Sequence, residues 1–291
     1  MGEQDTQADQ IPAPEIPRNG WDTLIVLQRH GRYDNRRPQD EANPTPAEMT
    51  YGHLTEEGKV EAKQRAQERI NATLSQDPSK TDFLIINSPT FWLDNEQLGQ
   101  RAKETAEIIA GAVLETLSDR GLSNEQFLNH SDRFKGEVSR PDSGIGEALM
   151  FQVPEFVNHL RQVYGGQPPS FWANYNRDTH RELREQTGAE GPGDIADRIN
   201  ERVNVVARFA HMYHFQHPDR KLVAWMVTHG DGLEPFVQRA LHIPEEAFSA
   251  GYNEGIGIGI DDQGVGKTTV RGIDYPVPLA SHGKPADIQS N

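Results

Sequence analysis

Cysteine is absent from this 291-residue sequence, and cationic side chains are few compared with anionic ones. Without cysteine there are no disulfides, thiolate metal ligands or cysteine nucleophiles, which is compatible with a reducing compartment. The 29 Lys and Arg residues against 44 Asp and Glu residues give a formal net charge of −15. That charge argues against a general nucleic-acid binder or a basic membrane-surface protein, and it makes any local cluster of arginines more informative.

Long apolar runs are also lacking, and the longest are far too short to span a bilayer. The first ten residues are polar and acidic, unlike a signal peptide. We therefore expect a soluble cytoplasmic protein without a membrane partner or a nucleic-acid partner; its oligomeric state stays open. Residues 1–20 are expected to form a disordered arm and residues 276–291 a loose tail, on either side of one folded domain at 21–275.

Stretches rich in β-branched and apolar residues are predicted to be buried strands, at 23–29, 83–87 and 221–227. Amphipathic helices are expected between and after them, at 55–77, about 96–117, 153–163, 194–215 and 233–241. The first helix should begin at the N-cap Thr55 and bury a stripe of Val60, Ala66, Ile70 and Leu74. This alternation predicts a three-layer α/β/α sandwich with a mostly parallel central sheet.

The glycine-rich segment 255–266 does not run from a strand into a helix, so it is not a phosphate-binding loop. We expect residues 255–260 and 267–273 to form a closing β-hairpin around a solvated acidic turn. Trp21, Trp172 and Trp225 are expected to pack in the core or under a lid.

Polar residues of a catalytic type follow each of the three predicted strands. Arg29, His30 and Gly31 end the first, Ser88 follows the second and leads to Arg101, and His229 follows the third. Because the carboxyl ends of parallel strands share one edge, these side chains should meet there. Two imidazoles and at least two guanidiniums suit phosphoryl transfer: a neutral ring nitrogen attacks phosphorus, and arginine forks neutralise the oxygens.

These motifs, in this order and strand context, resemble the histidine phosphatase superfamily, the phosphoglycerate-mutase-like group, and its first branch in particular. The first motif is Arg29-His30-Gly31, followed by the sequence Leu-Thr-Glu-Glu-Gly at 54–58; the last is Thr228-His229-Gly230. Ser88-Pro89 and the segment 101–106 resemble the second motif. The resemblance covers residues 23 to about 241.

The resemblance implies a phosphoglycerate-mutase-like fold and a small phosphorylated substrate, with neither a metal nor another cofactor. It assigns His30 as the nucleophile and places Arg29, Arg101 and His229 in the phosphate pocket. We also include Arg32 and Asn35 in that pocket.

Two departures from the family pattern matter. In the family, the second-motif arginine usually follows Ser-Pro within a few residues, whereas here residues 90–100 intervene as an insertion near the pocket mouth. Arg32, Arg36 or Arg140 would hold the place if Arg101 does not. Phosphoglycerate mutases carry a serine and an asparagine where this chain has Tyr33 and Arg36, which argues against that activity.

The family's proton donor is a Glu or Asp in the middle of the chain. Glu147 is our choice, because it follows two glycines in a polar segment, as a side chain reaching over a pocket from a loop would. Glu137 and Asp142 are rivals.

The series His211, His214 and His217 could suggest a metal site. On a helix, however, the third side chain has turned well away from the first two, and histidines near a helix C-terminus are favoured by the dipole. The favoured function is a metal-independent phosphatase that hydrolyses phosphomonoesters through a phosphohistidine on His30. The alternatives are a phosphomutase and a non-catalytic protein that binds a phosphorylated ligand with this fold.

Overall fold

The computed structural model describes residues 20–34, 52–75, 77–89, 100–130, 138–165 and 169–279. Most of the expected N-terminal arm, residues 90–99 of the expected insertion and the last twelve residues of the expected tail lie outside these ranges, as do Asn35, Arg36 and Glu137.

The described residues contain a seven-stranded sheet in the order β3-β2-β4-β1-β5-β6-β7. Its strands are β1 (Thr23–Arg29), β2 (Thr81–Asn87), β3 (Arg140–Pro141), β4 (Lys221–Thr228), β5 (Gly255–Ile260), β6 (Gly266–Val270) and β7 (Ile273–Val277). The three strands predicted from apolar runs are β1, β2 and β4, and they lie side by side at the centre. Their positions are confirmed within two residues.

The sheet is mixed, so the expectation of a mostly parallel sheet is wrong. Strands β3, β2, β4 and β1 pair in parallel, whereas β5, β6 and β7 add three antiparallel pairings. The connections after β5 and β6 are too short for a crossover, so the chain reverses there and pairs antiparallel. The predicted hairpin is present as β5 and β6, but its second strand ends at Val270 and not at 273, because a turn at 271–272 leads into β7. Val277 is buried and pairs with Gly266, so the last strand runs two residues beyond the boundary expected at 275.

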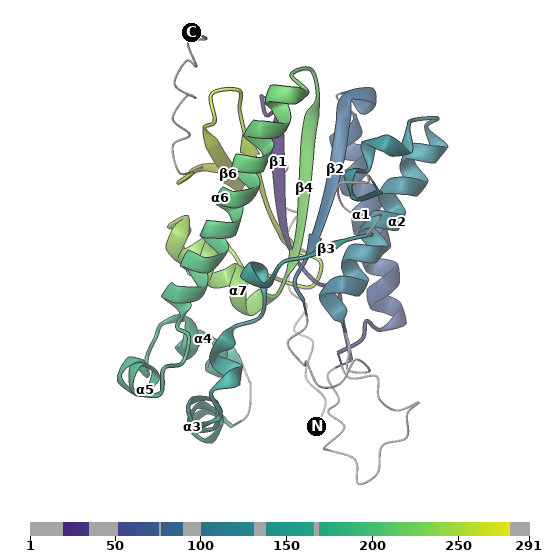
Figure 1. Cartoon of the computed structure of the whole chain (residues 1–291). Helices are drawn as coiled ribbons and strands as arrows, with labels where there is room; N and C mark the ends of the chain where they lie inside the picture. The colour runs from purple at the N-terminus through teal and green to yellow at the C-terminus, as the bar shows by residue number, and fades with distance from the viewer. Residues whose placement is uncertain are drawn as a thin grey trace.

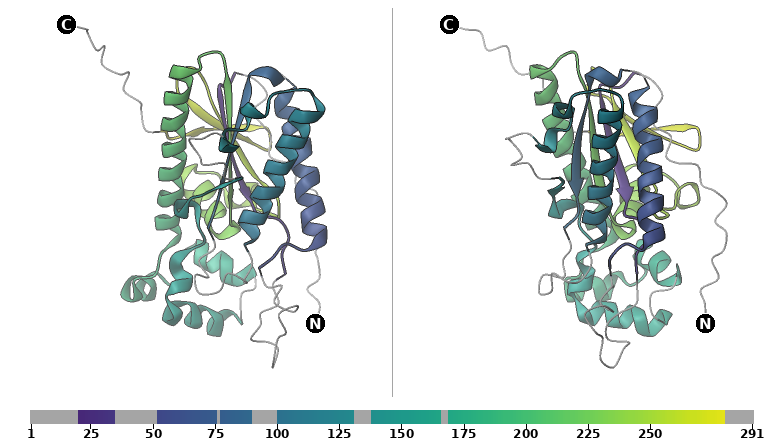
Figure 2. Two further views of the ribbon diagram at one scale, coloured as in Figure 1. Left: turned by 45° about the vertical axis from the view of Figure 1, so that its right-hand side comes forward. Right: turned by 90° about the vertical axis from the view of Figure 1, so that its right-hand side faces the viewer.

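Helices cover both faces of the sheet, which confirms the three-layer α/β architecture (Figures 1 and 2). One face carries α1 and α2, the opposite face carries α6 and α7, and three short helices lie beyond the carboxyl ends of β1, β2 and β4. The helices are α1 (Glu56–Leu74), α2 (Arg101–Asp119), α3 (Pro154–Tyr164), α4 (Pro169–Asn176), α5 (Arg181–Thr187), α6 (Pro192–Gln216) and α7 (Gly230–Pro235), which a π-helical turn, Phe236–Ala240, extends.

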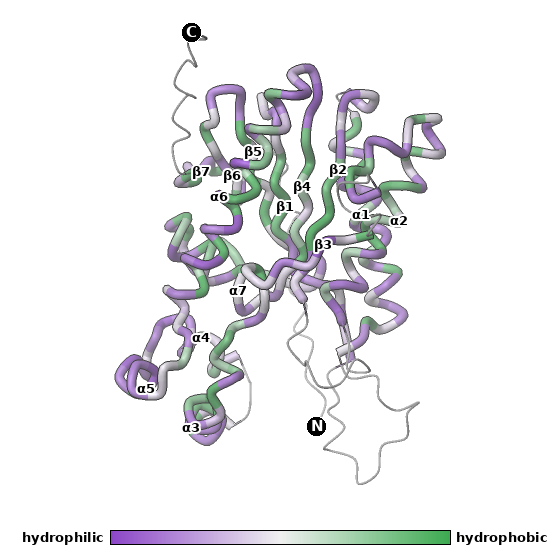
Figure 3. The backbone as a smooth tube through the Cα atoms, in the orientation of Figure 1, coloured by the Kyte–Doolittle hydropathy of each residue, from purple (hydrophilic) through white to green (hydrophobic). Residues whose placement is uncertain are grey.

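Alternation along β1 divides the core between the two faces. Leu24 and Val26 pack with α1 and α2, while Ile25 and Leu27 pack with α6 and the segments around it. The tube in Figure 3 is accordingly hydrophobic along the central strands. No helix in the described part of the chain combines the length and apolar character that crossing a membrane requires.

The α1 stripe differs from the prediction at one residue. Ala66, Ile70 and Leu74 are fully buried, but Val60 is 68% exposed. Six residues along an α-helix rotate by about 600°, which leaves Val60 about 120° away from Ala66. The predicted N-cap is confirmed, because the Thr55 hydroxyl accepts a hydrogen bond from the Gly58 amide.

Candidate active site

The first motif lies where β1 ends, between parallel β4 and antiparallel β5. The His30 amide donates to the Thr228 carbonyl, and the His30 carbonyl accepts from the Asn253 amide, so both neighbouring segments hold this residue. The Gly31 amide donates to the Thr105 hydroxyl of α2 (2.9 Å). The backbone at the end of the strand is therefore fixed from three directions.

The imidazole of His30 is buried and set for attack. Its Nδ1 lies 2.8 Å from the Gly31 carbonyl oxygen, which assigns the proton to Nδ1. Its Nε2 accepts a hydrogen bond from Arg101 Nε at 3.0 Å, so this nitrogen carries the lone pair. Burial, followed by the charges of Arg101, His229 and Arg29, holds the pKa of His30 well below its ordinary value of 6.5. The ring is therefore neutral and nucleophilic near neutral pH.

Arg101 is the first residue of α2, and the structure places it against His30 as the resemblance implied. Its guanidinium also forms an ion pair with Glu147 and lies 4.5 Å from the centre of the Tyr33 ring. Of the alternatives considered for its place, Arg32 is exposed with its guanidinium 5.6 Å from the Tyr252 ring, and Arg140 is exposed in β3.

The second imidazole, His229, faces the first with 5.0 Å between ring centres. Its Nε2 lies 2.8 Å from the hydroxyl of Ser88, and the Pro89 carbonyl oxygen lies 3.0 Å from the same hydroxyl. With the proton on Nδ1, toward the Glu147 carboxylate, Nε2 of His229 accepts from Ser88. Its Nδ1 is buried without a hydrogen-bond partner among the described residues, and 3.4 Å separates it from Glu147 Oε1. Burial first, and then the charges of three arginines (29, 101 and 198), hold the pKa of His229 well below 6.5.

Arg29 completes the group of cations. Its guanidinium donates to the Ala250 carbonyl (2.6 Å) and lies 4.3 Å from the centre of the Tyr252 ring. Its Nε is buried and has no hydrogen-bond partner within the described part of the chain. Together with His229 Nδ1, it is a donor without an acceptor, and an oxyanion would satisfy both.

Glu147 is the candidate acid that the structure brings to the site. Its carboxylate is buried and contacts both Arg101 and His229, so it occupies the position where donors for an anion converge. Asp142, a rival, instead caps the Gly144 amide at 2.8 Å and lies 3.6 Å from Arg202.

Sequence reasoning missed several residues of the site. Asp231 is half-buried and accepts from the Ala148 amide, and desolvation raises its pKa. Its place two residues after His229 was the available signal. Tyr33 and Tyr252 flank His30 at ring distances of 5.2 and 6.0 Å. Tyr252 comes from a loop that no motif marks.

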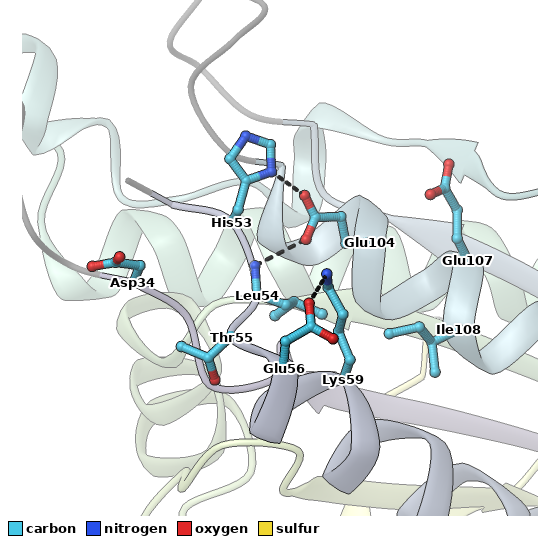
Figure 4. A pocket seen from close by; sticks show the side chains of 9 residues that line it. All are labelled: Asp34, His53, Leu54, Thr55, Glu56, Lys59, Glu104, Glu107 and Ile108. Atoms are coloured by element: carbon cyan, nitrogen blue, oxygen red, sulfur yellow. Dashed lines mark hydrogen bonds and ion pairs between the residues drawn. The ribbon is translucent and has the colours of Figure 1, made fainter. Parts of the chain in front are cut away.

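A separate cavity of about 760 Å³ lies beside the site (Figure 4). It contains a pairing of His53 with Glu104, which also accepts from the Leu54 amide, and an ion pair between Lys59 and Glu56. None of the four motif residues (Arg29, His30, Arg101 and His229) lines it. The cavity is thus a neighbour of the catalytic cluster and not part of it.

The three histidines of α6 do not assemble. His214 Nε2 lies 2.8 Å from the Thr23 hydroxyl, whereas His211 and His217 are exposed. Across the described ranges, no group of three or more His, Cys, Asp or Glu side chains is arranged to hold a metal ion.

No protein-family profile and no curated protein matches the sequence. Solved structures do match: a phosphoglycerate mutase from Bacillus anthracis str. Sterne aligns with a TM-score of 0.50 and 13% identity, covering 86% of this chain and 92% of its own. The chain has the phosphoglycerate-mutase-like fold. A mycobacterial glucosyl-3-phosphoglycerate phosphatase aligns with a TM-score of 0.44 and 17% identity, over 89% of this chain and 99% of its own. At such identities the likeness establishes the fold, and the activity has to be argued from the site.

Proposed function

We propose that this protein is a histidine phosphatase that hydrolyses small phosphomonoesters through a phosphohistidine on His30. The observation that carries the proposal is the state of that side chain: a buried, neutral imidazole whose Nε2 lone pair faces a guanidinium. A histidine held in this way is a nucleophile beside a donor for the oxygens it would attack.

The chemistry then follows in two steps. His30 Nε2 attacks phosphorus as the bond to the leaving oxygen breaks, and Arg101, Arg29 and His229 bind the other phosphoryl oxygens. Phosphate displaces the carboxylate of Glu147 from Arg101, and beside the anionic phosphate this carboxyl is favoured in its protonated form, from which it protonates the leaving alkoxide. In the second step Glu147 takes a proton from water as the water oxygen attacks phosphorus, which releases phosphate and restores neutral His30.

The alternatives fit the site less well. A phosphomutase would return the phosphoryl group to a second substrate hydroxyl, and Tyr33, in place of the serine of phosphoglycerate mutases, narrows the space beside His30. A binding protein requires cations for the phosphate but no neutral imidazole with an available lone pair.

The test is to trap the intermediate. The protein is treated with EDTA, screened against phosphorylated metabolites, and quenched during turnover, with His30→Ala as the control. We expect acid-labile, base-stable phosphate on His30 and none on the variant. Phosphate on a serine or an aspartate would show that the mechanism is wrong.

A further inference from the structure

The loop that carries Glu147, residues 143–149, is bound along its whole backbone by side chains from distant elements. Arg198 of α6 donates to the carbonyls of residues 143, 144, 146 and 147 at 3.2, 3.0, 3.4 and 3.1 Å. The carbonyl of residue 145, which Arg198 does not bind, accepts a hydrogen bond from the Thr228 hydroxyl. Asp231 and Glu190 accept from the amides of residues 148 and 149.

Arg198 and Glu190 act on this loop as one unit. Arg198 Nε and Nη2 donate to the two oxygens of Glu190 at 2.8 and 3.0 Å, and the side chains are only 18% and 10% exposed. The carboxylate thereby fixes the plane of the guanidinium, and the remaining N–H groups point at the loop. A lysine could keep the charge, but it could not reproduce this fork.

The loop needs such a support because its sequence does not stiffen it. Gly144 and Gly146 leave the backbone free to adopt many conformations, and the segment forms only a short 3₁₀ turn, Ser143–Ile145. A general acid has to sit within hydrogen-bond reach of the leaving oxygen, and a displacement of about 1 Å lowers rates substantially.

We propose that Arg198 and Glu190 are positioning residues for the general acid. They fix the backbone of Glu147, so that the movement from Arg101 to the leaving oxygen is left to the torsions of its side chain. The role rests on the proposed phosphatase function, since it acts on the reaction through Glu147. A lysine at position 198 keeps the positive charge that helps to lower the pKa of His229.

The chain offers a matched control. Arg184 forms a comparable two-point ion pair with Asp178, at 2.7 and 3.1 Å, with side chains 13% and 20% exposed. This pair links the middle of α5 to Asp178, just before that helix, and Arg184 also lies 3.5 Å from Asp194 of α6. Neither residue of the pair hydrogen-bonds to residues 143–149. Arg184→Lys therefore removes a fork of similar burial without touching the acid loop.

The experiment compares kcat/KM on glycerol phosphate, whose leaving group needs a proton, with kcat/KM on nitrophenyl phosphate, whose leaving group does not. We expect Arg198→Lys and Glu190→Gln to lower the glycerol phosphate value by about 10–10² and to spare the nitrophenyl phosphate value. Arg184→Lys should leave both unchanged. In a Glu147→Gln background, Arg198→Lys should cause no further loss, because the group it positions is already gone.

Three results would overturn the proposal. Equal losses on both substrates would mean that Arg198 supports the whole site, and a further loss in the Glu147→Gln background would mean that it acts independently of Glu147. If one variant fails to fold, the other decides the question. A chain that turns over neither substrate and forms no phosphohistidine would overturn the proposed function itself; normal turnover with no effect of either variant overturns only the positioning role.

Discussion

Two buried polar clusters lie at opposite ends of the same strands. At the amino end of β2 and β4, Asp82 accepts hydrogen bonds from the Tyr213 hydroxyl and from Nε and Nη2 of Arg220. At the carboxyl end, the imidazoles of His30 and His229 face each other. Both clusters join segments far apart in the sequence, yet their balance of donors and acceptors differs.

In the Asp82 cluster the carboxylate accepts from both of its neighbours, and its hydrogen bond favours the charged guanidinium of Arg220. Burial and the hydrogen bond to Asp82 raise the pKa of Tyr213, and the hydrogen bond to Asp82 raises the pKa of Arg220. In the histidine cluster, Arg29 Nε and His229 Nδ1 lack hydrogen-bond partners among the described residues, and both histidines are held neutral. The comparison teaches that a saturated network joins elements of the fold, whereas a network with surplus donors is ready for an anion.

The largest expected difference between the two clusters is in the rate of hydrolysis, and it follows from removing the acid, Glu147, beside the histidine cluster. Glu147→Gln should slow hydrolysis of alkyl phosphates by about 10²–10⁴, because no proton then reaches the leaving alkoxide. Phosphoryl transfer from nitrophenyl phosphate to His30 should be spared. The measurement is kcat/KM on both substrates; equal losses, or none, would reassign the acid to Asp142, Glu137 or Asp231.

Arg101→Ala tests the cation that lies against His30. We expect kcat/KM to fall by about 10²–10³, the usual scale for losing one preorganised donor. Arg101→Lys should rescue little of this loss, because a point charge cannot reproduce the fork. An effect below about fivefold would instead assign the phosphate to another cation.

The Asp82 cluster should respond in stability and not in rate. Asp82→Asn removes the charge that pairs with Arg220, and we expect it to lower the free energy of unfolding by about 1–3 kcal/mol. Denaturant unfolding measures this change, and kcat/KM on the same preparation should be unaltered. A loss of activity in the folded variant would show that the two ends of the sheet are coupled.

The smallest effect concerns pH. The pKa values of His30 and His229 lie well below 6.5 in the folded protein, whereas a histidine in the unfolded chain keeps its ordinary value of 6.5. At a pH between these two values, the unfolded chain binds protons at the two histidines and the folded protein does not. Stability should therefore fall as pH drops below 6.5, by up to about 1.4 kcal/mol per pH unit for each histidine. Urea unfolding at several pH values gives the free energy of unfolding as a function of pH. This free energy should change less steeply with pH for His30→Asn than for the unaltered chain. Identical slopes would mean that His30 is not held neutral.

The sequence allowed prediction of those strands, helices and site residues that leave a pattern in neighbouring positions of the chain. The central strands are continuous apolar runs, and the long helices repeat their apolar residues about every 3.6 residues, so strands and helices both leave strong patterns in the sequence. The motif residues follow strand ends, and parallel pairing of β1, β2 and β4 brings them together as expected. The fold class and the meeting of Arg29, His30, Arg101 and His229 were therefore predictable.

The remainder depends on contacts between distant segments. Buried Arg69 of α1 donates to the Asn253 carbonyl and thereby helps to hold the loop that carries Tyr252, and nothing in the sequence near either residue indicates this. The contact of Glu147 with Arg101 likewise depends on a loop whose carbonyls accept hydrogen bonds from distant Arg198. The short helices α4 and α5 are too brief to show a clear periodicity. The antiparallel orientation of β5 depends on its pairing with β1, which is distant in the sequence.

The pairing of β1 bears on how the protein is made. The proposed nucleophile lies at residue 30, but both neighbours of its strand, β4 and β5, come from the last third of the described chain. On the ribosome, β1 therefore emerges long before anything it can pair with, and contacts of such high sequence separation form slowly. Catalytic competence should thus appear only after residue 260 has left the exit tunnel.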